Sequence, residues 1–480
     1  MPNRSETRGA SSSDKPVKLS LASATPGMLS LACACLAAED GLALTPPRAW
    51  RSWNQFNGAV TQADVERALH GLADRSRLVD GKPTSLADLG YTDAGIDDGW
   101  QECGHYGPHQ YRYHDANGAP VVAEARFPSL SNLTALASSL GLTASWYANA
   151  CGCVGPPYTN CCSDHCDSTE CFVQDVNATL NYGFRGLKVD GCGAQRDIQL
   201  WYSLLETMRP PGAPPTLLEN CHDDDGLPTG NAPHRDDYGE LWCPFHLYRV
   251  SGDAGTLYGM ILDNLNSTRQ YAAQNLSVPG CWAYADMLEV GVTNTQLHIC
   301  GPAQNETCAP LTVAESRTHF GAWAIVSSPL VLSFDFANST NLDLHWPTVT
   351  NRDALAVNAA YAGFSGGLFF ESDDETEFSP CGFRAGLTCS WPRLMSWYKP
   401  LGGDDSRGST MAVLLMNNGD GPTTLSFAYA DVPGVANATT SCAVYDVWAR
   451  AALGRVGGGR FARDAVASRD SVFLTLGECR

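Results

Sequence analysis

The chain has 480 residues, enough for about three average domains or for one large domain and a small one. Its 31 Lys and Arg residues against 51 Asp and Glu residues give a formal net charge of −20, which excludes binding to nucleic acid through the phosphate backbone. A hydrophobic content of 44% with 17% charged residues excludes a disordered chain and predicts a large buried core.

The N-terminal residues and the cysteines indicate the secretory pathway. Residues 1–38 contain Lys15 and Lys18 before an apolar run that Pro26 and Gly27 interrupt, so we interpret them as a targeting segment, or else a disordered tail, and not as a membrane span. The chain has 19 cysteines, typical of an oxidising compartment. We therefore expect a secreted, vacuolar or lysosomal glycoprotein without stable membrane insertion. Eight Asn-x-Ser/Thr sites support this: Asn3, Asn132, Asn177, Asn266, Asn275, Asn305, Asn338 and Asn437.

Residues 39–365 alternate short apolar runs with amphipathic stretches. About eight strand–helix repeats favour a (β/α)8 TIM barrel, which places functional residues at the carboxyl ends of the strands. The predicted strands lie within 48–56, 91–100, 143–148, 186–192, 216–221, 247–254, 282–291 and 330–335. The predicted helices lie within 63–78, 129–140, 168–182, 197–208, 256–271, 315–327 and 352–361.

Residues 366–480 follow a different pattern. Acidic residues 371–377 and the segment from Cys381 to Cys389 are interpreted as a connector. Short alternating strands are then predicted at 411–416, 424–428, 443–448 and 472–476, separated by Gly- and Asn-rich turns. We expect a small C-terminal antiparallel β-sandwich domain.

Two predicted strands of the barrel end in carboxylates. In the run Gly186 to Cys192, Lys188 and Asp190 are two residues apart, so both side chains project to the same side, into the barrel mouth. The ammonium group favours the ionised carboxylate that a nucleophile requires, although a structural ion pair is the alternative. Asp97 and Asp98 end another strand, where sugar hydroxyls or a metal could balance their charge; a turn or helix cap is the alternative.

Other predicted strands add a second carboxyl group and aromatic walls. Arg249 and Asp253 follow the sixth strand, and a pair of carboxyl groups in one mouth is what glycosidases need, although a surface ion pair is the alternative. Trp53 ends the first strand and Asp286 follows Trp282 on the seventh. Aromatic side chains suit the apolar faces of pyranose rings, but each Trp could equally pack in the core.

In this order the motifs resemble those of glycoside hydrolase family 27, the α-galactosidases and α-N-acetylgalactosaminidases. The resemblance runs from about Gly41 to the C-terminus and is carried by WxxW at 50–53, IDDGW at 96–100, Trp-Tyr at 146–147, LKVDGC at 187–192, ENCH at 219–222, RxxxD at 249–253 and DML at 286–288. It implies a TIM barrel, a C-terminal β domain and a mechanism that retains the anomeric configuration.

The resemblance also implies roles for individual residues. Asp190 matches the nucleophile and Asp253 the acid/base, so Asp190 should be ionised and Asp253 protonated in the free enzyme. The substrate-binding matches are Asp97 and Asp98 for the 4- and 6-hydroxyls of galactose, Lys188 near C3, Arg249 toward O2, and Trp53, Tyr147 and Asp286 as wall and pocket residues. No cofactor and no metal is implied.

The sequence departs from the family pattern at two places. Tyr284 stands where the family usually has an acid, and Cys221 is followed by His222 and three Asp residues where galactosidases often have Glu-Trp. We expect His222 to face the sugar at its 2-position, where galactose and N-acetylgalactosamine differ.

Six cysteines fall within residues 151–171, where disulfide bonds are more consistent with the compartment than a metal site. The resemblance implies that an early member of this cluster, with Cys151 as the candidate, pairs with Cys192, and that Cys221 pairs with Cys243.

These features predict an exo-glycosidase that removes terminal α-D-galactose from oligosaccharides or glycoconjugates; the oligomeric state is open between monomer and homodimer. The alternatives are an α-N-acetylgalactosaminidase, a β-L-arabinopyranosidase and a catalytically silent galactose-binding protein. A galactose-binding protein without activity would need neither Asp190 nor Asp253. Arabinose has no 6-hydroxyl, so the presence of both Asp97 and Asp98 disfavours a pocket for arabinose.

Overall fold

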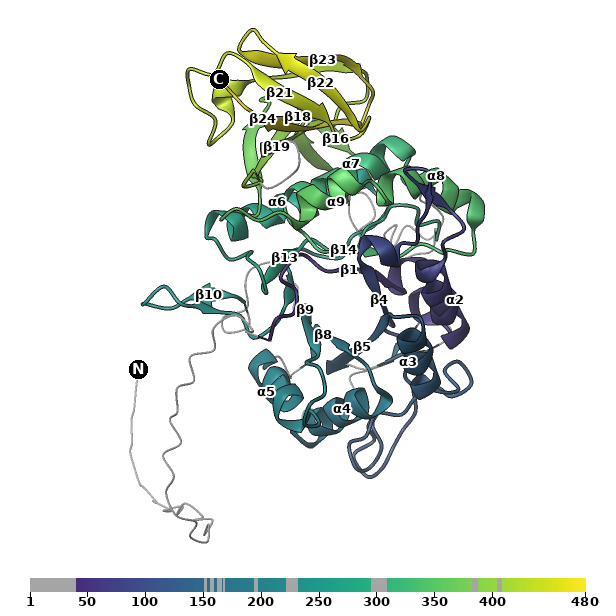
Figure 1. The fold of residues 1–480 in the computed structure, drawn as a ribbon. Helices are drawn as coiled ribbons and strands as arrows, with labels where there is room; N and C mark the ends of the chain where they lie inside the picture. Colours follow the sequence, from purple (N-terminus) through teal and green to yellow (C-terminus); the bar gives the residue numbers. More distant parts are fainter. Residues whose placement is uncertain are drawn as a thin grey trace, which may run out of the picture. The chain divides into compact units, whose positions relative to one another are not determined.

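The computed structural model describes residues 40–480 except 151–152, 156–158, 162–165, 167–168, 194–196, 222–231, 295–308, 382–386 and 404–407. Eight parallel strands form a ring in which successive strands lie side by side and the last strand pairs with the first (Figure 1). The ring confirms the predicted barrel. Its strands are β1 (Arg48–Arg51), β4 (Tyr91–Gly95), β5 (Thr143–Ala150), β8 (Gly186–Gly193), β9 (Leu217–Cys221), β12 (Leu247–Arg249), β13 (Trp282–Tyr284) and β14 (Leu330–Leu332).

The ring closes between its last two strands just beyond the end of β13. Leu288 lies beyond the end of β13, forms a parallel bridge with Leu332, and donates its N–H to the carbonyl of Val331 at 2.8 Å. Ala49, Leu247, Tyr284, Met287 and Val331 pack together in one small buried cluster. Two of these five residues, Tyr284 and Met287, lie at or after the end of β13, so apolar packing accompanies the closure.

Helices alternate with the strands. The helix α2 begins with a capping box between Thr61 and Asp64, and its apolar residues Val65, Leu69 and Leu72 are fully buried. The remaining helices are α3 (Leu130–Ser139), α4 (Thr169–Tyr182), α5 (Ile198–Met208), α6 (Tyr258–Ala273), α7 (Val313–Ile325), α8 (Ser339–Val349) and α9 (Arg352–Ala359), after α2 (Gln62–Ala73).

Several element boundaries differ from the predicted ones. The first strand was expected to reach Phe56, but it stops at Arg51 and Trp53–Phe56 forms the short helix α1. The strand expected through Trp100 stops at Gly95, because Asp98 and Gly99 turn the chain. Gly99 has φ +107°, and a Cβ there would lie 2.7 Å from the Cα of Gly58, so this turn requires glycine. The helix α8 was not predicted; it contains Pro347, a residue that argues against helix.

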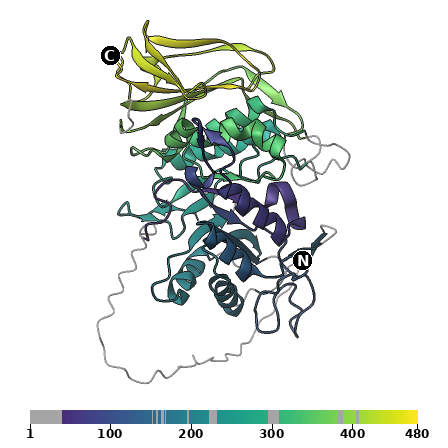
Figure 2. The same ribbon diagram turned by 45° about the vertical axis from the view of Figure 1, so that its right-hand side comes forward.

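The C-terminal residues form an antiparallel sheet of six strands, drawn in yellow and green in Figure 2. In spatial order these are β15 (Gly367–Glu371), β18 (Leu394–Pro400), β19 (Ser409–Asn417), β24 (Ser471–Gly477), β21 (Cys442–Asp446) and β22 (Ala451–Val456). The pair β20 (Thr423–Ala428) and β23 (Arg460–Val466) contributes Leu425, Phe427 and Phe461 to the buried cluster beneath this sheet. The two layers form the predicted β sandwich.

The expected connector is itself a part of this fold. The acidic segment 371–377 runs from the last residue of β15 through a turn into β16 (Glu375–Phe378), and β16 pairs with β17 (Cys389–Pro392). A disulfide bond joins Cys381 to Cys389. Helix α7 contacts the sandwich directly, since Arg469 forms an ion pair with Glu315 at 2.8 Å. None of the described helices is long and apolar enough to cross a membrane.

Candidate active site

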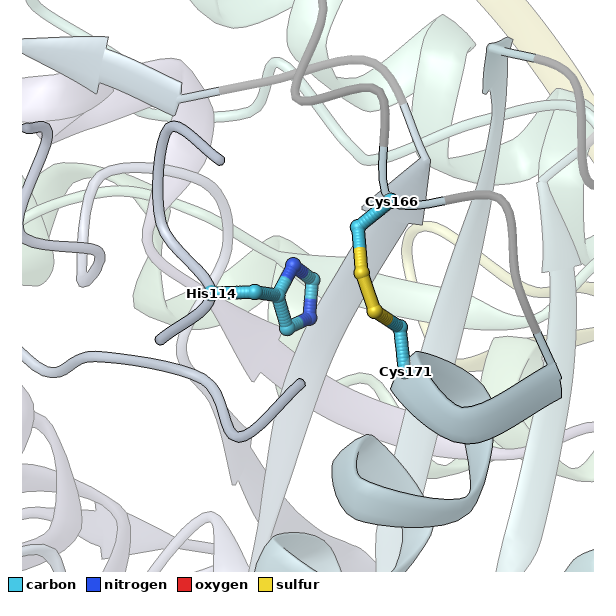
Figure 3. Close-up of side chains that lie close together, drawn as sticks. All are labelled: His114, Cys166 and Cys171. Carbon is cyan, nitrogen blue, oxygen red and sulfur yellow. A yellow bond between two sulfur atoms is a disulfide. The ribbon is translucent and has the colours of Figure 1, made fainter. Parts of the chain in front are cut away.

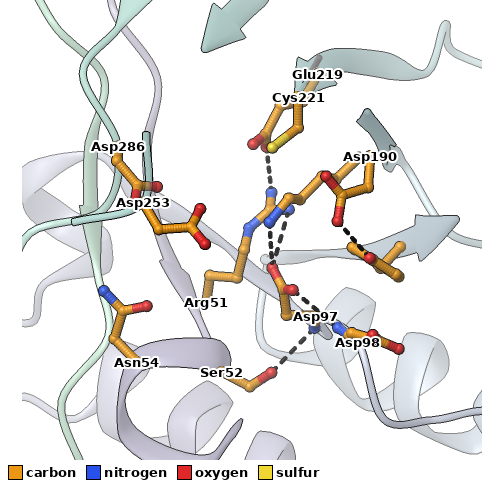
Figure 4. A network of polar contacts seen from close by, with 12 residues as sticks. Arg51, Ser52, Asn54, Asp97, Asp98, Asp190, Glu219, Cys221, Asp253 and Asp286 are labelled. Atoms are coloured by element: carbon orange, nitrogen blue, oxygen red, sulfur yellow. Dashed lines mark hydrogen bonds and ion pairs between the residues drawn. The ribbon is translucent and has the colours of Figure 1, made fainter. Parts of the chain in front are cut away.

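The predicted site residues gather at the carboxyl ends of the barrel strands (Figure 4). Asp97 and Asp98 follow β4, and Asp190 lies near the end of β8. Asp253 and Asp286 lie on the loops that follow β12 and β13. Segments that are far apart in the sequence therefore place five carboxyl groups around one mouth.

Asp97 is almost fully enclosed, at 2% exposed. The Lys188 ammonium lies 2.8 Å from Asp97 Oδ2, and the backbone N–H of Asp97 donates to Ser52 Oγ at 3.0 Å. Burial by itself would raise the pKa of Asp97, but the charges of Lys188 and Arg51 outweigh it and hold the pKa below its usual value. Asp97 is thus an ionised acceptor for hydroxyl donors.

The pKa of Asp98 is shifted in the opposite direction from that of Asp97. Burial, and then repulsion from Asp97, raise its pKa to about 7. No cation is among the causes of this shift, and Asp190 adds further repulsion. Two adjacent carboxyl groups therefore differ in charge below neutral pH: Asp97 accepts hydrogen bonds, whereas protonated Asp98 can also donate one.

The raised pKa of Asp98 is expected to make stability fall as the pH rises. Between about pH 4 and pH 7 the folded protein keeps a proton on Asp98 that the unfolded chain has released, so the free energy of unfolding falls across this window. An Asp98→Asn variant should lack this loss, which amounts to about 4 kcal/mol at most for a shift from 3.8 to about 7.

Urea unfolding of both proteins at several pH values measures this difference. Asp237→Asn changes an exposed carboxylate that is not one of the five at the mouth and should keep the wild-type slope. An Asp98→Asn variant with the wild-type slope would contradict the assignment.

Asp190 is held by two hydrogen bonds. Its Oδ1 accepts from the backbone N–H of Gly191 at 2.8 Å, and its Oδ2 accepts from the Tyr147 hydroxyl at 2.5 Å. Tyr147 is itself fixed, because Asn149 donates to its hydroxyl oxygen at 3.1 Å and the ring of Trp100 donates to its carbonyl at 2.9 Å. The carboxyl group of Asp190 is therefore oriented from both of its oxygens.

Arg249 links the other two carboxylates. Its guanidinium lies 3.0 Å from Asp286 Oδ1 and donates to Asp253 Oδ1 at 3.2 Å. The side chain of Asp253 is 60% exposed, whereas that of Asp286 is 2% exposed. Burial raises the pKa of Asp286 against the attraction of Arg249. Asp253 is therefore the more accessible of these two carboxyl groups.

The backbone at Asp286 is strained and is held by its neighbours. Its φ is +84°, which a residue other than glycine seldom adopts. The indole of Trp323 on α7 donates to the Asp286 carbonyl at 2.7 Å, and the N–H of Ala254 donates to Asp286 Oδ2 at 2.6 Å. This strained turn aims the carboxylate at Arg249, and Arg249 in turn contacts Asp253.

Trp53 begins α1 at the same mouth, next to Asn54, whose side chain donates to Glu289. Burial raises the pKa of Glu289 well above its usual value. Tyr284, the residue in place of the expected acid, is buried with its hydroxyl near Glu219 and Asp286. Tyr284, which replaces the acid usual in the family, therefore lies in the barrel interior.

The sequence reasoning missed the buried pair of Arg51 and Glu219. Arg51 was noted only as part of WRSW and Glu219 only as part of ENCH, yet their charges lie 2.6 Å apart beneath the mouth. The signal was available: Arg51 is two residues from inward-facing Ala49, and Glu219 is two residues from Leu217, which packs against the same cluster.

The disulfide expected between Cys221 and Cys243 is wrong. Cys243 pairs with Cys281, and Cys221 is a buried free thiol whose sulfur accepts from Arg249 at 3.5 Å. Cys243 lies a few residues before β12 in the ring, and Cys281 directly precedes its neighbour β13, which brings the two together. His222, Cys151 and the side chain of Cys192 lie outside the described residues, so their expected positions stay predictions.

In the cysteine-rich segment, Cys166 and Cys171 form the disulfide bond that was expected of this cluster (Figure 3). A further disulfide joins Cys442 to Cys479. His114 lies beside the first of these bonds, with its Nε2 atom 2.9 Å from an oxygen of Asp175. Because the two sulfurs are bonded to each other, they are not thiolate ligands here.

Comparison with known proteins agrees with this architecture. Residues 394–476 match the family model described as alpha galactosidase C-terminal beta sandwich domain. An alpha-galactosidase of Cyamopsis tetragonoloba is 25% identical over 88% of this chain and 84% of its own length, and an alpha-N-acetylgalactosaminidase of Rattus norvegicus is 26% identical over 73% and 77%.

Two solved structures share the whole fold. Alpha-galactosidase I of Mortierella vinacea matches with a TM-score of 0.63 at 20% identity, covering 92% of this chain and 98% of its own. A family 27 β-L-arabinopyranosidase of Geobacillus stearothermophilus matches with a TM-score of 0.66 at 18% identity, covering 91% and 97%. The barrel, the sandwich and the sequence relatives agree: they support the assignment of this chain to glycoside hydrolase family 27, the family of the α-galactosidases, and the chain is a glycoside hydrolase.

Proposed function

We propose that this enzyme removes terminal α-D-galactose from oligosaccharides or glycoconjugates with retention of the anomeric configuration. The observation that carries the proposal is the contrast between two carboxyl groups at one mouth. Asp190 is oriented through both oxygens, as suits a nucleophile, and Asp253 is 60% exposed, as suits an acid that meets departing groups. Retention itself rests on the resemblance to the family.

In the first step, the proton of Asp253 passes to the glycosidic oxygen while an oxygen of Asp190 attacks the anomeric carbon. The bond to the leaving alcohol breaks and a glycosyl ester of Asp190 forms. In the second step, the Asp253 carboxylate takes a proton from water, which attacks the same carbon and releases galactose and the Asp190 carboxylate. These steps use only carboxyl groups of the chain.

The remaining residues supply hydroxyl recognition in this proposal. Asp97, ionised beside Lys188, accepts from sugar hydroxyls, and Asp98 takes part in the same contact. Arg249 faces the 2-position and Trp53 forms a wall. The described disulfide bonds favour an oxidising compartment, so we propose delivery through the secretory pathway.

The test is hydrolysis at about pH 5 of three nitrophenyl glycosides: the α-galactoside, the α-N-acetylgalactosaminide and the β-L-arabinopyranoside. We expect the α-galactoside to have the highest kcat/KM and proton NMR to show α-galactose as the first product. A higher kcat/KM on the α-N-acetylgalactosaminide would favour the alternative of an α-N-acetylgalactosaminidase, which is the name of the rat relative. If none of the three glycosides is cleaved, the alternative of a catalytically silent galactose-binding protein replaces the proposal.

A further inference from the structure

A buried ion pair lies directly beneath the sugar-facing carboxylates. The guanidinium of Arg51 on β1 is 2.6 Å from Glu219 Oε2 on β9, and the two residues are 4% and 1% exposed. Arg51 is also 3.8 Å from Asp97 Oδ2, the oxygen that Lys188 contacts (Figure 4). Arg51 thus joins Glu219, in the barrel interior, to a residue of the mouth.

This pair is not explained by stability. Taking two charges out of water costs about as much as their attraction returns, and apolar side chains of similar volume are often as stable. Other polar atoms of the pair are also left without hydrogen bonds: Arg51 Nε and Nη1 and Glu219 Oε1 have no hydrogen-bond partner among the described residues. A packing role would be served as well by a neutral pair.

The charged groups around Asp97 indicate that the Arg51–Glu219 pair acts on this carboxylate. Lys188 from β8 and Arg51 from β1 are the cations beside it. Carboxyl groups of Asp98 and Glu219 and the hydroxyl of Tyr147 also face Asp97. Lys188 alone would have to balance Asp97 while it also faces Asp190 and Glu219.

We propose that Arg51, held in place by Glu219, is a positioning residue that keeps Asp97 ionised and aimed at the sugar. The inference rests on the proposed function, in which Asp97 binds sugar hydroxyls. Arg51 does not touch the reacting atoms; it acts on affinity through Asp97. Its removal should therefore change KM and the acidic side of the pH profile more than kcat.

The first test separates positioning from packing with three variants: Arg51→Met, Glu219→Gln and the double variant. Arg51→Met should raise KM about tenfold and move the acidic limb of kcat/KM upward by about one pH unit, because Asp97 loses a cation and takes up a proton more readily. In the double variant no charge is left unpaired, so thermal stability should return toward wild type while KM and the acidic limb stay shifted.

A double variant with wild-type KM and an unshifted limb would overturn the inference. In that case the wild type still cleaves its substrate, so the proposed function survives. If the wild type cleaves none of the three glycosides, the proposed function itself has failed.

The second test uses the space below the pair. A cavity of about 630 Å³ opens at the amino ends of the strands and is bounded by Arg51 and Glu219, with Asp93 and Ser145 beside them. Arg51→Ala would connect its own vacated space to this cavity, which gives a small solute a path from the side opposite the substrate.

Millimolar guanidinium added to Arg51→Ala should restore kcat/KM about tenfold, whereas urea, which has the same shape and no charge, should not. Equal effects of guanidinium and urea would overturn the inference. The matched control is Arg185→Ala, which removes another cation of the cavity wall. The side chain of Arg185 makes no hydrogen bond or ion pair to the described residues, so this variant should keep wild-type KM and respond to neither solute.

Discussion

Asp190→Ala is expected to lower kcat on nitrophenyl α-galactoside by at least ~10⁴-fold, because the covalent step then has no nucleophile. The variant should fold, since Asp190 is partly exposed and the hydrogen bonds it would lose come from Tyr147 and Gly191. Steady-state rates and a thermal unfolding curve measured on the same preparation separate loss of chemistry from loss of structure.

Adding azide to Asp190→Ala tests whether the lost carboxylate is the nucleophile. In the space left by Asp190, azide can attack the anomeric carbon from the side that the carboxylate used, so the product should be β-galactosyl azide. Asp237→Ala removes an exposed carboxylate elsewhere and should keep wild-type rates with no azide adduct. Residual activity above one percent, or no effect of azide on the rate, would argue that another group is the nucleophile.

The sequence predicts the barrel well because its signal is local and repeated. Each strand of the ring is a short apolar run, so all eight were located, and the order in the ring follows the order in the chain. Strand ends were less accurate. Trp53 was assigned to a strand, but it begins a helix. Residues 96–100 were assigned to a strand that ends at Gly95, because Asp98 and Gly99 turn the chain.

Pairings between distant residues could not be predicted in the same way. Arg51 and Glu219 are 168 positions apart, and each reads locally as one charged residue in an apolar strand. Cys243 has several candidate partners by sequence, and only the neighbouring positions of β12 and β13 bring it to Cys281. The site residues that were predicted are those that motif order identifies, whereas the layer beneath them depends on which strands become neighbours.

Asp253→Ala is expected to lower rates in proportion to how poor the leaving group is. A glycosidic oxygen of a sugar needs a proton to depart, whereas dinitrophenolate leaves without one. We therefore expect a loss of ~10³-fold on raffinose and less than about tenfold in the first step on dinitrophenyl α-galactoside. The exposed position of Asp253 beside Arg249 supports this role, because departing groups leave through the mouth that this carboxyl group lines.

The second step of the same variant gives an independent readout. Without a base to activate water, the glycosyl ester of Asp190 should accumulate, so the dinitrophenyl substrate should show a burst. Azide, which needs no base, should then release α-galactosyl azide, the opposite anomer from that expected with Asp190→Ala. Two variants that give opposite anomers would assign the two carboxyl groups to opposite faces of the sugar. The same anomer from both, or equal losses on raffinose and the dinitrophenyl substrate, would show that Asp253 is not the acid and that Asp286, held by the same Arg249 at 3.0 Å, is the next carboxyl group to test.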